Sequence, residues 1–189
     1  MKTLVAGLLG FAMLLGSTGV ASAEAYKVDS VHSFVMFKIG HMNTGWVWGR
    51  FNGPTGTFSL DAENPQNSRF DVTLQVESID TANKDRDAHL RSNDFFHAEE
   101  HPTITFKSTG VDKVDDNTLK VTGDITLLGQ TKPVTVEIKT GDPVEAQGAR
   151  RIGLQGTFTI QRSDFGMDGM LNAIADEVEL HVALEGVTE

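Results

Sequence analysis

Hydrophobic and polar residues alternate along most of the chain after residue 32, and a period of two is typical of β-strands with one buried face. Residues 69–77 show the pattern clearly, because every second side chain is apolar: Phe70, Val72, Leu74 and Val76. Residues 177–185 repeat it with Val178, Leu180, Val182 and Leu184. The same alternation in residues 104–108, 119–127, 134–138 and 152–160 predicts four further strands.

Residues 33–39 and 46–60 bring the expected number of strands to about eight. Turn-forming pairs such as Asn64-Pro65 and Leu128-Gly129 separate many of them, and the gaps are short. Strands that follow one another without intervening helices favour an antiparallel up-and-down sheet. Such a sheet either closes into a barrel or folds into a sandwich.

Residues 81–100 interrupt this all-β pattern. Thr81 is a candidate helix cap, and Leu90, Phe95 and Phe96 give the segment an apolar side. We therefore expect one crossing segment, helical near residues 82–97, that lies over an end or side of the sheet.

The first 23 residues have the pattern of a secretory signal peptide. Lys2 precedes a short apolar run, and the segment ends in Ala21-Ser22-Ala23. We expect cleavage after Ala23, export to the periplasm and a single mature domain over residues 24–189. The apolar run is too short to span a bilayer, and because no second apolar stretch follows it, no integral membrane anchor is expected.

Composition narrows the possible functions. The chain has no Cys, which excludes disulfides and thiol chemistry. Its 16 basic and 26 acidic residues give a net charge of −10, which argues against nucleic acid and anionic lipid surfaces as partners.

Residues 97–101, His-Ala-Glu-Glu-His, match the H-x-x-E-H zinc signature of one group of metalloproteases. A zinc enzyme of this kind needs both imidazoles on one face of a regular helix. His101 precedes Pro102, and the residue before a proline is pushed out of helical geometry. We therefore expect a solvated loop in which the two imidazoles do not share a helix face, and no bound metal. Because other catalytic motifs are also missing, the sequence favours a binding protein over an enzyme.

Three longer stretches carry a resemblance to a known family. They are DSVHSFVMFKIGHMNTGWVWGRFNGPTGTF at 29–58, SIDTANKDRDAHLRSNDFFHAEEHPTITFKS at 78–108 and GDITLLGQTKPVTVEI at 123–138. The chain resembles the YceI-like polyisoprenoid-binding family of exported, lipocalin-like proteins over essentially its whole mature length. The resemblance implies an eight-stranded antiparallel up-and-down barrel with a hydrophobic tunnel. It implies a long-chain isoprenoid lipid as ligand, of the polyprenyl phosphate or isoprenoid quinone type, held for transport, storage or sequestration without a further cofactor.

The inward-facing positions of the predicted strands would line such a tunnel. These are Val35, Phe37, Ile39, Phe51, Phe58, Phe70, Leu74, Phe106, Ile125, Phe158 and Leu180. Three residues of the crossing segment are candidates for contact with a head group: Arg86, His89 and Arg91. Nearby aspartates at 85, 87 and 94 offer these side chains structural partners instead. Trp46 and Trp48 share one strand face, which either rims a mouth or covers the outside.

Two alternatives to a lipid carrier remain open from the sequence. Alternating apolar residues also fill the core of any barrel or sandwich, so the chain can be a protein-interaction module without a cavity. The His residues around 81–101 allow, less readily, a metal-dependent hydrolase or an isomerase. A homodimer is compatible with either function.

Overall fold

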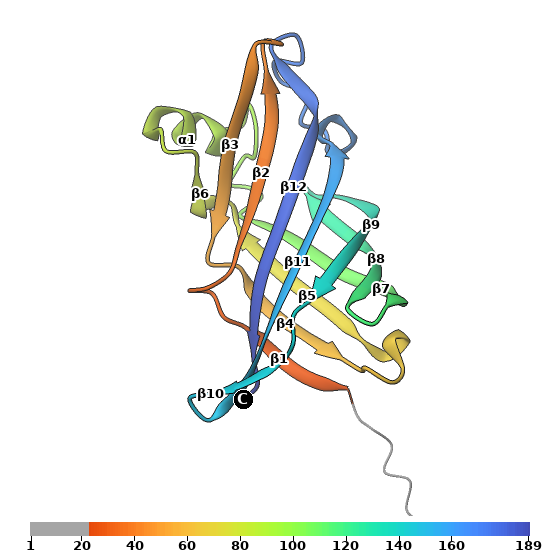
Figure 1. Ribbon diagram of the computed structural model, residues 1–189. Coiled ribbons are helices and arrows are strands. Elements are labelled where there is room, and N and C mark those ends of the chain that lie inside the picture. Colours follow the sequence, from red (N-terminus) through yellow and green to blue (C-terminus); the bar gives the residue numbers. More distant parts are fainter. Residues whose placement is uncertain (1–22) are drawn as a thin grey trace, which may run out of the picture.

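The computed structural model describes residues 23–189 (Figure 1). The predicted signal peptide, apart from Ala23, lies outside the described residues. Twelve strands occur in the described part: β1 Glu24–Val28, β2 Phe34–His41, β3 Gly45–Asn52, β4 Thr55–Leu60, β5 Arg69–Gln75, β6 Ile79–Asp80, β7 Thr103–Asp115, β8 Thr118–Leu127, β9 Gln130–Thr140, β10 Val144–Ala146, β11 Ala149–Gln161 and β12 Ile174–Val187. One α-helix, α1 Lys84–Arg91, and the 3₁₀ helices η1 Pro65–Asn67, η2 Val76–Ser78 and η3 Arg162–Phe165 complete the described elements.

These strands form one closed, eight-stranded antiparallel barrel. Each of the first three barrel strands is broken into two segments, β1 with β2, β3 with β4, and β5 with β6. Every barrel strand pairs with the next along the chain, and β12 closes the ring against both β1 and β2. The predicted up-and-down barrel is therefore confirmed, and the sandwich is not formed.

The breaks occur where the backbone cannot continue a ladder. Between β3 and β4, Gly53 has a φ of 59° and Pro54 has no N–H to donate. Between β1 and β2, the Asp29 carboxylate accepts the backbone N–H of Val31 at 2.9 Å, which fixes a tight turn. These bends curve the sheet enough for it to close.

One end of the barrel is filled by aromatic side chains. Phe58 stacks on Tyr26 with ring centroids 5.1 Å apart and on Phe70 at 5.9 Å. Gly186 on β12 gives the Phe58 ring its space, because a Cβ at residue 186 would lie 2.2 Å from Cζ of Phe58. We call this the closed end.

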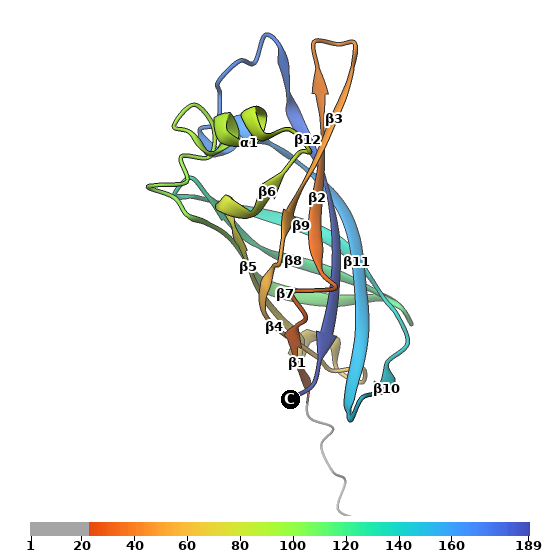
Figure 2. The ribbon, with the colours of Figure 1, turned by 90° about the vertical axis from the view of Figure 1, so that its left-hand side faces the viewer.

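Helix α1 lies next to β6, away from the closed end of the barrel (Figures 1 and 2). It is shorter than the expected 82–97, and turns occupy residues 93–96 and 98–100. Its cap is Asn83, whose side chain accepts the N–H of Arg86 at 3.0 Å. Thr81, the expected cap, instead donates its N–H and its hydroxyl to the buried carboxylate of Asp87 at 2.8 and 2.5 Å.

Within residues 23–189, the structure contains no helix that is both long enough and apolar enough to cross a membrane.

Candidate functional site

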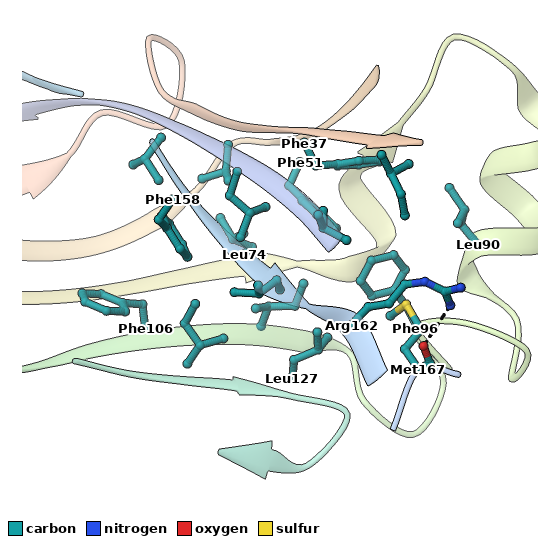
Figure 3. Close-up of a pocket in the computed structure, with 18 of the residues that line it drawn as sticks. Phe37, Phe51, Leu74, Leu90, Phe96, Phe106, Leu127, Phe158, Arg162 and Met167 are labelled. Atoms are coloured by element: carbon teal, nitrogen blue, oxygen red, sulfur yellow. Dashed lines mark hydrogen bonds between the residues drawn. The ribbon is translucent and has the colours of Figure 1, made fainter. Parts of the chain in front are cut away.

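The interior of the barrel contains a cavity of about 410 Å³ (Figure 3). Its volume falls within the roughly 300–1,000 Å³ typical of small-molecule sites. The lining is mainly Val, Leu, Ile and Phe from barrel strands. Its few polar side chains are Arg86 and His89 of α1, Arg162 of η3, and His41 and Thr105 of the strands. The arrangement suits a slender apolar ligand with a polar end.

Ten of the eleven side chains expected in the tunnel line this cavity: Val35, Phe37, Ile39, Phe51, Phe70, Leu74, Phe106, Ile125, Phe158 and Leu180. Phe58 does not, because it belongs to the aromatic stack at the closed end. Four of the lining side chains are only partly buried although they face the inside of the barrel, because they border open space: Ile39, Phe106, Phe158 and Leu180. The interior is therefore hollow, which a filled core would not be.

A layer of apolar residues from outside the ladder covers the cavity. Phe96, from the turns after α1, packs edge-on against Phe51 with ring centroids 5.5 Å apart. Leu90, Phe95 and Met167 add to the cover, and Met170 lies beside them at the cavity wall. The sequence indicated the apolar side formed by Leu90, Phe95 and Phe96, but it gave no sign that the two methionines face the same space.

The three candidate head-group residues differ in their position relative to the cavity. Arg86 and His89 line the cavity, and Arg91 does not. Arg86 donates to the hydroxyl and the carbonyl of Thr81 at 2.8 and 2.7 Å rather than to an aspartate. Nε2 of His89 lies 3.0 Å from the Asp94 carboxylate.

Arg91 contacts the segment before α1 instead. Its guanidinium donates to the carbonyls of Glu77 and Ile79, each at 3.2 Å, and lies 3.4 Å from the Glu77 carboxylate. Its role is therefore to hold η2 and β6 against the helix.

Arg162 is a cavity-lining cation that the sequence interpretation missed. It is 2% exposed, and its guanidinium donates to the backbone carbonyls of Met167, Ile174 and Ala175 at 2.8, 3.1 and 2.9 Å. Burial lowers the pKa of Arg162, and the charges of Asp176 and Asp168 offset part of that lowering. An arginine keeps its proton even so, and in the described part of the chain this guanidinium hydrogen-bonds to backbone carbonyls rather than to a carboxylate. The cavity therefore has a positive charge where η3 covers it.

The H-x-x-E-H residues come together in the structure. No helix carries them, but His97 adopts a φ of 46° and the N–H of His101 donates to its carbonyl at 2.8 Å. This turn places the imidazole centroids 5.8 Å apart, and one ligand atom each from His97, Glu100 and His101 lies within 4.8 Å of the others. The two imidazoles share no helix face, as the argument from Pro102 predicts, but a turn brings them together instead. The three side chains lie outside the lining of the cavity.

Trp46 and Trp48 cover the outside of the barrel. They are 69% and 46% exposed, whereas Val47 between them lines the cavity. The ammonium of Lys38 lies 5.5 Å from the centroid of Trp46 and 5.7 Å from that of Trp48. The strand face that carries the two tryptophans therefore points outward.

Comparison with known proteins gives concordant results. The family model described as the YceI-like domain matches residues 26–186. The chain is 41% identical to Protein YceI of Escherichia coli, over 96% of each chain. Its structure is similar to that of Burkholderia cenocepacia BcnA, with a TM-score of 0.74 and 25% identity over 84% of this chain and 98% of that one. A polyisoprenoid binding domain from Saccharophagus degradans shares the fold, with a TM-score of 0.68 and 15% identity over 87% of this chain and 98% of that one.

Proposed function

Because the chain belongs to the YceI-like family, we propose that it is an exported, periplasmic binding protein that holds a long-chain isoprenoid lipid inside its barrel. The observation that carries the proposal is the hollow, mainly apolar cavity, whose two arginines, Arg86 and Arg162, both lie where α1 and η3 cover it. A neighbour of the same fold is described as a polyisoprenoid binding domain, which supports this class of ligand.

The apolar chain of such a ligand supplies most of the affinity. Burying one methylene contributes about 0.8 kcal/mol, so one five-carbon unit contributes roughly 3 kcal/mol or more before entropic costs. A few isoprene units therefore outweigh one exposed polar contact.

The head group of the ligand then determines which isoprenoid lipid is bound. Arg162 is a buried donor and Arg86 an exposed one at the covered part of the cavity, and both prefer an acceptor oxygen. A phosphate of a polyprenyl phosphate and a carbonyl of an isoprenoid quinone both supply one. The positive charge of Arg162, which hydrogen-bonds to backbone carbonyls rather than to a carboxylate, favours the phosphate.

Lipid extraction followed by mass spectrometry of purified protein tests the proposal. We expect a long-chain isoprenoid lipid in the wild type and less of it in Val35→Trp, which adds an indole to the cavity. Gln75→Trp is the matched control, because residue 75 is exposed. Equal lipid in the two variants, or none in wild type and control, would overturn the proposal in favour of an interaction module. Intact-mass measurement of exported material is expected to give a chain that begins at Glu24.

A further inference from the structure

The hairpin of β2 and β3 ends in a turn at residues 42–44, and the loop 166–173 lies beside that turn (Figure 1). The backbone N–H of Met42 donates to the carbonyl of Ala173 at 2.6 Å, and His41 pairs with Ile174. The hairpin turn and this loop therefore form one structural unit, which we call the tip (residues 40–46 and 166–174).

The tip exposes large apolar side chains. Met42 is 61% exposed, Trp46 69%, Met170 50% and Leu171 45%. A cluster of such residues on a soluble protein marks a surface that meets an apolar partner.

The tip is also nearly free of negative charge. The chain contains 26 acidic residues, yet there is no Asp or Glu from Ser30 through Leu60. Asp168 is the one carboxylate in residues 166–174. Below the turn, the Lys38 ammonium lies over Trp46 and 3.6 Å from the Glu179 carboxylate, so the charges nearest the tip are compensated. Entry of the tip into an apolar medium would desolvate little charge.

The surface of the tip is continuous with the cavity. His41, Met170 and Ile174 belong to the tip and also line the cavity, whereas Tyr26 and Phe58 fill the opposite end. A water-insoluble ligand that enters or leaves near the tip passes over apolar side chains.

We propose that the tip docks on the surface of a phospholipid bilayer, so that the ligand passes between bilayer and cavity without crossing water. This inference rests on the proposed function. Met42 and Leu171 insert among the acyl chains, Trp46 lies at the level of the head groups, and Lys38 extends toward the aqueous side, as Trp and Lys do at membrane interfaces. The overall charge of −10 opposes anionic surfaces, so apolar contact with zwitterionic lipid drives docking.

The test is sedimentation of the purified full-length mature protein with phosphatidylcholine vesicles. The variant Met42→Ser/Trp46→Ser/Leu171→Ser removes exposed apolar side chains from the tip and spares Met170, which lines the cavity. The matched control is Val31→Ser/Val114→Ser/Val144→Ser, which changes side chains 82%, 51% and 55% exposed outside the tip. We expect the tip variant to bind vesicles at least about tenfold more weakly and the control to bind as the wild type does.

A second readout uses fluorescence. Trp46 and Trp48 are the two tryptophans of the chain, so their emission should shift to shorter wavelength when the wild type meets vesicles. Wild type without affinity for vesicles, or a tip variant that binds equally well, overturns the docking inference. Ligand content of each protein is measured in parallel: normal lipid content with no vesicle binding rejects docking alone, whereas absence of lipid from every protein rejects the proposed function.

Discussion

The ring of Phe37 on β2 occupies the space where a side chain of residue 49 on β3 would lie. A Cβ on Gly49 would be 2.3 Å from Cζ of Phe37, and the two residues are paired across the ladder. The glycine thus allows the ring to lie flat against the wall instead of projecting into the cavity. The size of the cavity depends on this pair.

Replacement of Gly49 by Ala should therefore push the Phe37 ring toward the lumen. We expect a loss of stability of about 1–3 kcal/mol, the usual range for overpacking, and less lipid per protein. Chemical unfolding and lipid extraction measure the two effects. Gly45→Ala, on the same strand with open space around its Cβ position, is the control and should change neither. Similar behaviour of the two variants would show that Phe37 does not shape the cavity.

Arg162 should determine which head groups the protein accepts. Arg162→Met roughly keeps the side-chain volume but removes the charge. The amount of bound phosphate-bearing lipid should therefore fall about tenfold or more relative to the amount of bound neutral lipid. The variant also leaves three buried carbonyls without their donor, so its stability is expected to fall. The ratio of the two lipid classes separates selection from simple loss of folded protein.

Arg91→Met is the control for this experiment, because Arg91 lies outside the cavity lining. Its lipid ratio should equal that of the wild type. An unchanged ratio in Arg162→Met would remove Arg162 from the head-group site.

Stability should depend on pH through the ion pairs that join β1, β11 and β12. The Asp29 carboxylate accepts hydrogen bonds from His32 and Arg151, and these hold its pKa well below the usual range. The hydrogen bond to Asp29 in turn raises the pKa of His32 above 6.5. Asp29 therefore stabilises the fold above about pH 4, the unfolded value, and this contribution is lost as pH falls toward the folded pKa. His32 stabilises the fold below about pH 6.5, and its contribution is lost as pH rises through the folded pKa.

The melting temperature, measured from pH 3 to 8, reports both the loss of the Asp29 contribution at low pH and the loss of the His32 contribution at high pH. We expect a maximum between about pH 4 and 6.5. His32→Asn should flatten the decline on the alkaline side and leave a weaker decline on the acid side, because Arg151 still donates to Asp29, whereas Asp29→Asn should weaken both more strongly. A profile of His32→Asn that parallels the wild type throughout would exclude this pair as the origin.

Much of the cavity is predictable from sequence, because a strand has a period of two and the pattern identifies the inward face. Val35, Phe37 and Ile39 were assigned in this way. Phe58 has the correct parity but lies at the closed end, and parity contains no information about height along the barrel axis. Arg162 continues the inward series of Phe158 and Ile160. Its even position therefore places it on the inward face, although the predicted strand ended at Ile160.

Residues that depend on loop geometry were harder to predict. The proximity of His97 and His101 requires a positive φ at His97. Residues other than glycine seldom adopt this backbone angle, and no local sequence pattern indicated it. The exposed tip likewise depends on how the loop 166–173 meets the β2–β3 turn, a contact between segments more than a hundred residues apart.

The proximity of His97, Glu100 and His101 supports a last prediction about metal content. Two imidazoles that share a tetrahedral zinc ion have ring centroids about 5 Å apart, so the observed 5.8 Å is near binding geometry. Three features weaken such a site nevertheless. Glu100 has an exposed side chain, the set provides three ligands, and within residues 23–189 the polar contact of the His97 ring is Glu100 itself rather than an outer partner that orients it. We therefore expect no stoichiometric metal in protein purified without chelator, as elemental analysis will show. His97→Ala serves as the comparison: one zinc ion per chain in the wild type that disappears in this variant would contradict the expectation and establish a metal site on the outside of the barrel.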